Sequence, residues 1–295
     1  MSVSVLTLVR GRRAHLANLI AGLNASRRKP DELVIAYMQP AAHIDLPSTD
    51  FPIREVFVSG DAMPLAAARN RAAAAASGKQ LIFLDVDCVP SPTLVERYVE
   101  TGSEPGGIRL GEVLYLPAGA ITDGIDFVAL DRIGKRHPDK PPIALGEIRP
   151  TPTHGELWGL SFGISAADWT RAGGMDERYV GYGGEETDFA ARLERAGVAM
   201  WWVGGARVSS APHRPHAGLP AFRRDHPQCA VVSGDMGAMV HAILAWPVRR
   251  ERFDRVGCGY DNGLAPADRG GNDCFEDATG DAVQLRPGAC PTLRV

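Results

Sequence analysis

The sequence predicts an α/β fold, with a mostly parallel central sheet flanked by helices on both faces. Two patterns predict it: short β-rich runs alternate with helical periodicity over the first 90 residues, and the order strand–helix–strand occurs twice. The length of 295 residues allows one large domain or two small ones, and is enough to bury a substantial core. Ligands of such sheets bind beyond the carboxyl ends of the strands, so functional residues are expected there.

Four strands are expected in this region, as runs rich in β-branched and large apolar residues at 2–9, 33–38, 53–58 and 81–84. Between the first two, apolar residues within 16–23 recur at i, i+3, i+4 and i+7, which predicts an amphipathic helix. The alanine-rich stretch 65–77 predicts a second helix that ends at Gly78 as its C-cap.

The later elements are a helix at 94–100, a strand at 111–116, a helix at 185–196 and a strand at 198–203. Residues 134–156 are rich in Pro, Lys, Arg and His without periodicity, so a loop is expected. Long loops in compact domains are usually functional lids or disordered, so a lid that orders over bound donor is one hypothesis for this stretch.

Composition excludes several classes of protein. Lys and Arg number 32 against 35 Asp and Glu, a net charge of −3, so no global basic surface indicates nucleic acid. No stretch approaches the roughly 20 apolar residues of a membrane span, and no signal peptide is recognisable. Five scattered cysteines without a CxxC pair predict neither a zinc site nor a disulfide framework. We expect a cytoplasmic protein, with peripheral association at the inner face of the membrane left open.

The sharpest motif is the apolar run 81–84 that ends in Asp85 and Asp87. Residues i and i+2 of an extended chain share a face, so the two carboxylates are expected to converge where the sheet meets its ligand. Such a pair suits a hard divalent cation. A cation that bridges a diphosphate would explain how a protein without a basic surface binds an anionic substrate. The alternative is an ordinary strand exit, where aspartate is common.

A second cluster places Glu185, Glu186 and Asp188 in the first turn of a helix, directly after the glycine-rich turn 181–184. Acids at a helix N-terminus are stabilised by the macrodipole, and Asp188 could simply pair with Arg192 at i+4. Three acids exceed what a helix start requires, so we favour a role for one of them as a general base.

A third feature is Pro212-His213-Arg214-Pro215-His216, which follows a strand. Neutral imidazole binds transition metals, so His213 or His216 could complete a metal site begun by Asp87. A histidine in a proline-rich loop is more often solvated surface, and that alternative stays open.

Together these features resemble the GT-A glycosyltransferases of the family 2 superfamily. The resemblance is strongest to enzymes whose C-terminal half is like that of β-1,4-galactosyltransferases, chondroitin-polymerase-type enzymes and polypeptide N-acetylgalactosaminyltransferases. It runs from about Ser4 to His216 and includes the segments 5–10, 66–71, 173–177 and 183–186 besides the DxD motif of the two aspartates. It implies a GT-A (Rossmann-like) sheet with a smaller acceptor-side subdomain.

The resemblance implies an inverting enzyme that holds a nucleotide-sugar, in first place a UDP-sugar, through Mn²⁺ or Mg²⁺ on its diphosphate. The acceptor would be a hydroxyl of a carbohydrate or glycoconjugate, as in polysaccharide biosynthesis. The implied metal ligands are Asp87, Asp85 and His213, with His216 as the alternative imidazole. The implied base is Glu186; since this chain has Glu-Glu where the family usually has Glu-Asp, Glu185 and Asp188 stay open as alternatives.

The resemblance also implies contacts to the two parts of the donor. The residues implied to bind the nucleotide are Thr7, Arg10, Asp61, Arg69, Asn70 and Asp85. Those implied to line the donor or acceptor sugar are Trp158, Phe162, Gly163 and Gly184. The implied divisions of the chain are a nucleotide-sugar-binding half at 1–105, an acceptor and catalytic half of the same domain at 106–216, a helical extension at 217–256 and a loosely structured tail at 257–295.

Two other functions remain as alternatives. In a haloacid-dehalogenase-type, Mg²⁺-dependent phosphatase, Asp85 would be the nucleophile and Asp87 the acid/base, but that motif usually lies on the first strand and here three strands precede it. A non-catalytic homologue that binds a sugar nucleotide would keep the fold without turnover.

Overall fold

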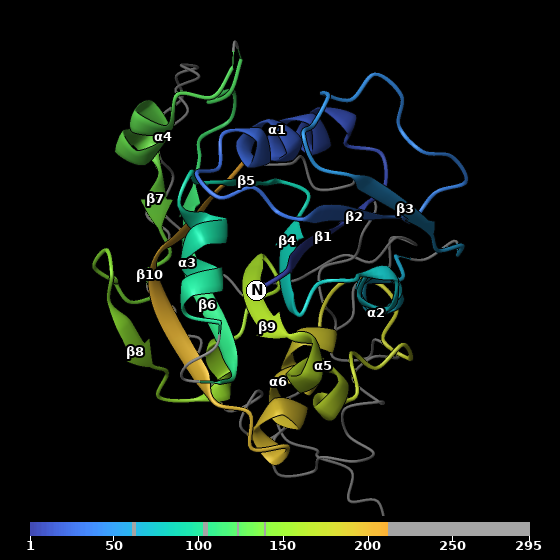
Figure 1. Ribbon diagram of the computed structural model, residues 1–295, viewed down its shortest axis with the longest axis vertical. Helices are drawn as coiled ribbons and strands as arrows, with labels where there is room; N and C mark the ends of the chain where they lie inside the picture. Colours follow the sequence, from blue (N-terminus) through green and yellow to red (C-terminus); the bar gives the residue numbers. More distant parts are fainter. Residues whose placement is uncertain (61–62, 103–105, 123, 139, 212–295) are drawn as a thin grey trace, which may run out of the picture. The chain divides into compact units, whose positions relative to one another are not determined.

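The computed structural model describes residues 1–60, 63–102, 106–122, 124–138 and 140–211. Asp61, His213 and His216 lie outside the described residues, as do the expected divisions 217–256 and 257–295. In the described part, helices flank one mixed sheet of ten strands, as Figure 1 shows. The predicted α/β class, with a central sheet flanked by helices, is confirmed.

The elements alternate along the chain much as their patterns predict. The strands are β1 Val3–Val9, β2 Glu32–Tyr37, β3 Ile53–Phe57, β4 Gln80–Asp85, β5 Cys88–Pro90, β6 Ile108–Tyr115, β7 Lys135–Arg136, β8 Ile148–Pro150, β9 Ser161–Ser165 and β10 Met200–Ser210. The helices are α1 Arg13–Asn24, α2 Leu65–Ala75, α3 Leu94–Glu100, α4 Phe127–Ile133, α5 Ala166–Ala172 and α6 Glu185–Arg195, with a 3₁₀ turn at His154–Glu156.

The N-terminal half of the sheet is parallel. Its strands lie in the order β3-β2-β1-β4, and each pairs in parallel with its neighbour. Every residue of β1 and β2 is buried, which explains why these strands are nearly continuous apolar runs. The carboxyl ends of β1, β2 and β4 therefore meet at one edge of the sheet.

The C-terminal half is joined to this sheet through β9, which runs antiparallel to both β4 and β6. Beyond it, β6 and β10 are parallel, and the short β5 pairs antiparallel with the end of β10. Because β5 follows β4 after a two-residue turn and pairs with the end of β10, the end of β10 lies beside the residues that follow β4.

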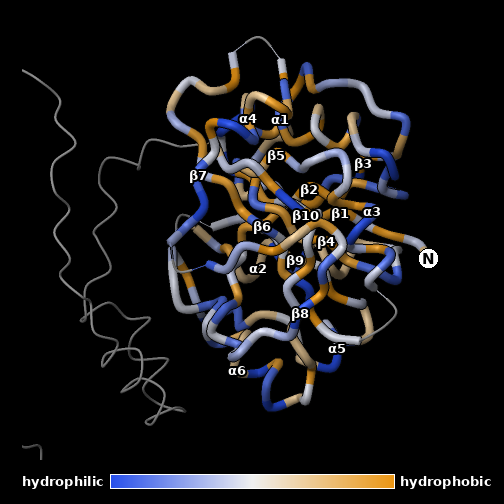
Figure 2. The backbone as a smooth tube through the Cα atoms, turned by 90° about the vertical axis from the view of Figure 1, so that its left-hand side faces the viewer, coloured by the Kyte–Doolittle hydropathy of each residue, from blue (hydrophilic) through white to orange (hydrophobic). Residues whose placement is uncertain are grey.

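Two apolar layers cover the faces of the sheet. One contains side chains of α2, α5 and α6 and the alternate β1 residues Leu6 and Leu8; the other contains side chains of α1 and α3 with Val5 and Val9. In Figure 1, α1 lies at the top of the drawing and α5 and α6 lie together at the bottom. Among the described residues, Figure 2 shows the strands between these helices as the most hydrophobic stretches.

Aromatic side chains fill the layer under α5 and α6. The Phe83 ring stacks on Phe162 and on Trp169, with 4.6 Å between centroids in each case. Trp169 in turn contacts Phe189 of α6 at 4.9 Å. This stack joins β4, β9, α5 and α6, and so fixes where α6 begins relative to the end of β4.

Several expectations about boundaries are corrected. The predicted strands 111–116 and 198–203 are longer, as β6 and β10, and β10 carries a register shift between Trp202 and Arg207. Part of the predicted loop 134–156 pairs with the sheet as the short strands β7 and β8.

Gly78 is not the C-cap of α2, because the helix already ends at Ala75 and Ala76 is extended. Instead the Gly78 N–H donates to the Ser4 hydroxyl at 2.8 Å. A Cβ at residue 78 would lie 2.5 Å from the Ser4 nitrogen, so glycine is needed there for the close approach of two chain segments.

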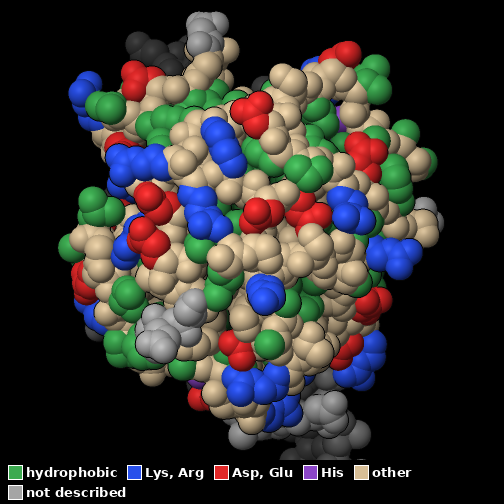
Figure 3. All heavy atoms as spheres, viewed as in Figure 1, with side chains coloured by type: hydrophobic (Ala, Val, Ile, Leu, Met, Phe, Trp, Pro, Cys, Tyr) green, Lys and Arg blue, Asp and Glu red, His purple; other side chains and the backbone are tan. Residues whose placement is uncertain are grey.

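Within the described part of the chain, no helix is both long and apolar enough to cross a membrane. On the face drawn in Figure 3, basic and acidic side chains are interspersed. That face carries no continuous basic surface, in agreement with the near-neutral composition.

The aromatic stack yields a test of the core. Replacement of Phe162 by Ala should lower the free energy of unfolding by about 3–5 kcal/mol, because it leaves a cavity between Phe83 and Phe189. The matched change F57A should cost much less, since Phe57 is 46% exposed. Urea denaturation measures both; equal losses for the two variants would contradict this packing.

Candidate functional site

A cleft of about 200 Å³ opens at the edge where the parallel strands end. Its walls come from the ends of β1 and β4, from α2 and from the turn before α6. The residues that line it are Leu8, Arg10, Arg12, Met38, Met63, Leu65, Arg69, Asp85, Val86, Tyr182, Gly183, Glu185 and Glu186. The cleft thus unites the first two motifs of the sequence, which lie a hundred residues apart.

The buried guanidinium of Arg69 holds these motifs together. Its side chain is only 2% exposed, and it donates to Asp85 Oδ1 at 3.0 Å, Glu185 Oε1 at 3.3 Å and Glu186 Oε1 at 3.3 Å. Since Arg69 lies on α2, Asp85 ends β4 and the two glutamates begin α6, one side chain cross-links three elements. Arg69, expected at the nucleotide, is therefore first of all a partner of the carboxylates.

The cluster carries more negative than positive charge. Burial raises the pKa of Asp85 to about 7; Arg69 lowers it, while Asp87 and Glu186 raise it further. Burial and the neighbouring Glu186 likewise raise the pKa of Glu185, whose Oε2 is buried without a hydrogen-bond partner. One guanidinium does not balance these carboxylates, so the cleft favours the arrival of a cation.

Two glycines make the cluster sterically feasible. A Cβ on Gly159 would lie 1.9 Å from Glu186 Oε1 and 2.5 Å from an Arg69 nitrogen. Gly184 precedes α6 with φ of +91°, and a Cβ there would lie 2.8 Å from the Tyr179 ring. Gly184, expected at the sugar, thus has a structural role, because it lets α6 begin with both glutamates directed to Arg69.

Asp85 and Asp87 do not lie on one extended strand, which corrects the sequence argument. β4 ends at Asp85, residues 86–87 form a turn, and β5 begins at Cys88. Asp85 lines the cleft, whereas Asp87 is buried beside the Cys88 thiol, with Oδ1 at 3.8 Å from the sulfur. The two carboxylates still interact electrostatically across the turn.

The end of β10 lies beside Asp87. The Ala211 N–H donates to the Asp87 carbonyl at 2.9 Å, and Ser210 pairs with Cys88 in the ladder between β10 and β5. Chain that continues past Ala211 therefore starts next to Asp87.

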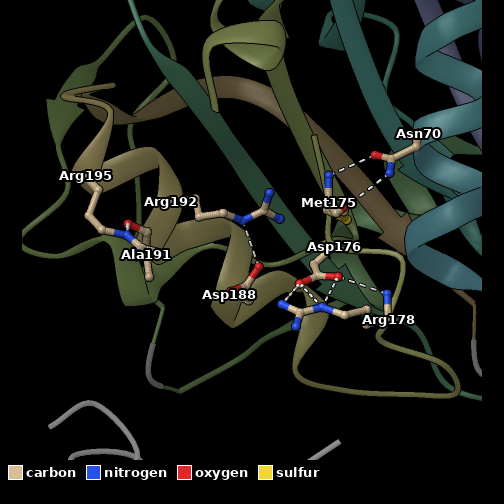
Figure 4. Close-up of polar contacts among 8 residues, drawn as sticks. All are labelled: Asn70, Met175, Asp176, Arg178, Asp188, Ala191, Arg192 and Arg195. Carbon is tan, nitrogen blue, oxygen red and sulfur yellow. Dashed lines mark hydrogen bonds and ion pairs between the residues drawn. The ribbon is translucent and has the colours of Figure 1, made fainter. Parts of the chain in front are cut away.

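The three acids of α6 have different surroundings. Glu185 is buried against Arg69, while the Glu186 side chain is 31% exposed and faces the cleft. Asp188 instead accepts from Arg192 Nε at 2.8 Å, as its i+4 spacing allowed, and does not line the cleft. Figure 4 shows this pair beside the ion pair of Asp176 and Arg178.

Asn70 binds a loop rather than lying in the cleft. Its amide accepts from the Met175 N–H at 2.8 Å and donates to the Met175 carbonyl at 2.7 Å, as Figure 4 shows. It also donates to Glu177 at 2.9 Å. The residue expected at the nucleotide thus fixes the Gly173-Gly174 turn that leads toward α6.

Of the other residues expected to bind the nucleotide, Thr7 does not line the cleft, whereas Arg10 does. Thr7 is buried on the face of β1 opposite the cleft, while its neighbour Leu8 pairs with Asp85 and lines it. Arg10 lines the cleft, and its guanidinium donates to the Met38 carbonyl at 2.5 Å and the Gly60 carbonyl at 2.6 Å.

A second hollow of about 530 Å³ adjoins the cleft at Arg10 and Met38, and extends between Gln39 and Phe57 at the ends of β2 and β3. The Phe57 ring on its wall is stacked on Tyr37 at 5.5 Å. The two hollows together extend along the carboxyl edge of the parallel strands.

The sugar-side expectations are corrected in part. Phe162 is fully buried in the aromatic stack, and a Cβ on Gly163 would lie 3.1 Å from the Tyr98 ring, so both lie in the sheet interior. Trp158 is half-buried, with the Lys140 ammonium 4.3 Å from its ring centroid and the His137 ring edge-on at 4.9 Å. Neither Trp158 nor the two core residues line the cleft.

The carboxylates fit a divalent cation by donor chemistry, since Mn²⁺ and Mg²⁺ prefer oxygen ligands and keep positions for phosphate oxygens. Among the residues that the structure describes, however, no group of three His, Cys, Asp or Glu side chains is arranged to hold a metal ion. The expected imidazole ligand, His213, lies outside that part.

Sequence reasoning did not assign Arg12 and Tyr182 to the site, although both line the cleft. Arg12 directly precedes α1 with φ of +50°, and its guanidinium donates to the Tyr182 hydroxyl at 3.3 Å. Only their positions in the sequence could have indicated this: Arg12 follows β1, and Tyr182 lies in the glycine-rich turn before α6.

Two family models match the chain. One, described as glycosyl transferase family 2, covers residues 43–108. The other, described as the N-terminal domain of galactosyltransferase, covers residues 143–216 and so includes the acids of α6. Together these two matches support the resemblance to GT-A glycosyltransferases of the family 2 type.

Two curated proteins similar to this chain are validoxylamine A glucosyltransferases from Streptomyces hygroscopicus, subspecies jinggangensis (strain 5008) and limoneus. Each is 28% identical over 178 residues, which cover 55% of this chain and 42% or 39% of the relative. The chain thus matches less than half the length of these relatives.

Solved structures of similar fold include GalNAc-T7 with UDP, GalNAc and Mn²⁺, with a TM-score of 0.56 and 17% identity over 79% of this chain and 48% of that one. The S. aureus protein TarS, residues 1–349 with UDP-GlcNAc, has a TM-score of 0.53 and 11% identity over 76% of this chain and 62% of that one. At these identities the likeness concerns the fold.

The charge balance around Arg69 yields a stability test in chelator-treated protein. R69M should lower the free energy of unfolding by about 3–5 kcal/mol near neutral pH, because it leaves buried carboxylates without their cation. The folded variant should then bind more protons than the unfolded chain, so its deficit should grow as pH rises from about 4 toward 7 and above.

The control is R71M, which changes an exposed arginine of the same helix and should have little effect at any pH. Urea denaturation at several pH values measures both variants. An R69M deficit that is constant or shrinks with rising pH would contradict the account.

Proposed function

We propose that this glycosyltransferase transfers a sugar, with inversion, from a nucleotide-diphosphate sugar to a hydroxyl group of an acceptor such as a glycan. The first candidate donor is a UDP-sugar, since the similar structures of GalNAc-T7 and TarS contain UDP or UDP-GlcNAc. The observation that carries the proposal is the meeting of Asp85 and Glu186 on one guanidinium, at the carboxyl edge of the parallel strands.

The donor would lie along that edge. Its nucleotide would occupy the hollow between Arg10, Gln39 and Phe57, and its diphosphate would point into the adjoining cleft toward Asp85. Arg10 and Met38 line both hollows, which supports this placement.

Asp87 and Asp85 would hold Mn²⁺ or Mg²⁺. The ion would stabilise the negative charge that develops on the leaving diphosphate. A third ligand from His213 is consistent with the chain path: Ala211 is hydrogen-bonded to Asp87, and two further residues can span at most about 7 Å.

Glu186 is the proposed general base. It is the α6 acid that both lines the cleft and is partly exposed, so it can accept the proton of an acceptor hydroxyl. Arg69 would keep it oriented, and Glu185 would balance the buried guanidinium. One base opposite the leaving group suffices for displacement with inversion, whereas the second carboxylate of retaining glycoside hydrolases serves a different reaction.

The acceptor side would lie toward Trp158. This ring contacts Tyr115, whose pKa is raised to about 12 by burial and by Cys88, Asp87 and Asp85. Tyr115 pairs with Ser210 of β10, which pairs with Cys88 next to Asp87, so Tyr115 links the Trp158 ring to the proposed metal ligands. The phosphatase alternative finds no support, because the fold and family matches are those of glycosyltransferases.

Replacement of Glu186 by Gln should reduce the rate of sugar transfer by about 10²–10⁴-fold, because the amide cannot take the proton. Donor binding should be retained. D188N is the matched control, since Asp188 pairs with Arg192 outside the cleft. Steady-state kinetics measures sugar transfer, and donor titration measures binding. Full transfer by E186Q, or loss of transfer in D188N alone, would show that Glu186 is not the base.

Replacement of Asp87 by Asn should abolish the Mn²⁺-dependent part of UDP binding, because it removes a charged metal ligand. Calorimetric titration of UDP with and without Mn²⁺ measures this. D176N, which breaks an exposed ion pair with Arg178, serves as the control. If the wild type binds UDP equally strongly with and without metal, the proposal that a metal ion at Asp87 holds the diphosphate is wrong.

A further inference from the structure

Three arginines line the cleft, and two of them are already engaged. The Arg10 guanidinium donates to backbone carbonyls, and Arg69 is surrounded by three carboxylates. In the described part of the chain, Arg12 has no carboxylate partner, and its guanidinium donates to the neutral hydroxyl of Tyr182. Among the described residues, Arg12 is therefore the cleft arginine that bonds to neither a carboxylate nor a backbone carbonyl, so its guanidinium can turn to an anionic ligand.

The bond from Arg12 to Tyr182 is suited to exchange. Its length of 3.3 Å lies beyond the usual range for N–H···O bonds, and its acceptor carries no charge. A phosphate oxygen accepts from a guanidinium at shorter distance and far more strongly, often through two parallel bonds. An anion in the cleft would thus replace the tyrosine as the preferred partner.

The backbone holds Arg12 in this place at a conformational cost. Its φ of +50° and ψ of +38° are left-handed, which is uncommon for a residue with a side chain and is found often at functional sites. On the opposite side, Tyr182 is 42% exposed and lies in a turn whose Gly181, Gly183 and Gly184 all have positive φ. The pair therefore joins the segment after β1 to the segment before α6.

We propose that Arg12 binds the donor diphosphate, and that the Tyr182 hydroxyl positions the guanidinium over the cleft before the donor arrives. The inference rests on the proposed function. It makes Arg12 the source of the positive charge that a diphosphate needs besides a metal ion. The other two cleft arginines are engaged, Arg69 by carboxylates and Arg10 by backbone carbonyls.

The test is calorimetric titration of UDP in the presence of Mn²⁺ at several salt concentrations. R12Q should weaken UDP binding by about 10-fold or more, as expected for loss of a charge-assisted bond, and the salt dependence of the affinity should become shallower. R12K should recover part of the affinity, since it restores the charge without the planar guanidinium.

R13Q is the matched control. Arg13 is the next residue, is exposed, and donates to the Ile44 carbonyl at 2.9 Å and the Asp45 carbonyl at 2.5 Å, away from the cleft. It should change the affinity less than twofold. Thermal unfolding of both variants checks that neither change acts through stability.

The role of Tyr182 is tested by a double-mutant cycle. Y182F should weaken UDP binding in the wild-type background, but should have no effect in R12Q, because the hydroxyl acts through Arg12. Equal effects of Y182F in both backgrounds would overturn the positioning role.

The outcomes separate this inference from the function beneath it. Wild-type binding of UDP with R12Q unchanged, or with R13Q equally weakened, would overturn the role of Arg12 and leave the proposed function intact. A wild-type protein that binds neither UDP nor GDP with Mn²⁺ would overturn the proposed function, and this inference with it.

Discussion

The buried guanidinium of Arg69 is the interaction on which the geometry of the site depends. It lies between the end of β4 and the start of α6 and bonds to Asp85, Glu185 and Glu186. A buried charge without its partners is strongly destabilising, so the fold keeps all three carboxylates close to it. The side chains that would hold a cation and accept a proton are thus fixed relative to each other by one residue that does neither. Gly159 leaves the space that this arrangement needs.

The same cluster accounts for the kind of ligand that the cleft attracts. Its negative charge exceeds what one arginine can balance, and burial raises the pKa of Asp85 to about 7. A divalent cation relieves this excess, and a cation with open positions then attracts phosphate oxygens. The carboxylates around Arg69 can in this way contribute to a site for an anionic donor without a basic surface, in agreement with a net charge of −3 and the interspersed charges in Figure 3.

Sequence patterns predicted the parallel half of the fold and the two motifs of the cleft, because both depend on local periodicity and on the rule that ligands bind at the carboxyl edge. They did not predict which side chains face that edge. Thr7 and Leu8 are neighbours in β1, so their side chains point to opposite faces of the sheet. Which of the two faces the cleft follows from the pairing of Leu8 with Asp85. Phe162 was expected at the sugar, yet the register that places it opposite Phe83 is a long-range property. The short strands β7 and β8 likewise form through distant partners rather than through their own composition.

The central claim is that the cleft around Arg69 holds a metal-bound nucleotide diphosphate. The most direct measurement is anomalous diffraction from crystals grown with Mn²⁺ and UDP. The account predicts a manganese peak within bonding distance of the Asp87 carboxylate, with diphosphate density that leads from it toward Arg10. A manganese peak remote from both Asp85 and Asp87, or UDP bound away from the carboxyl edge of β1 and β4, would contradict it.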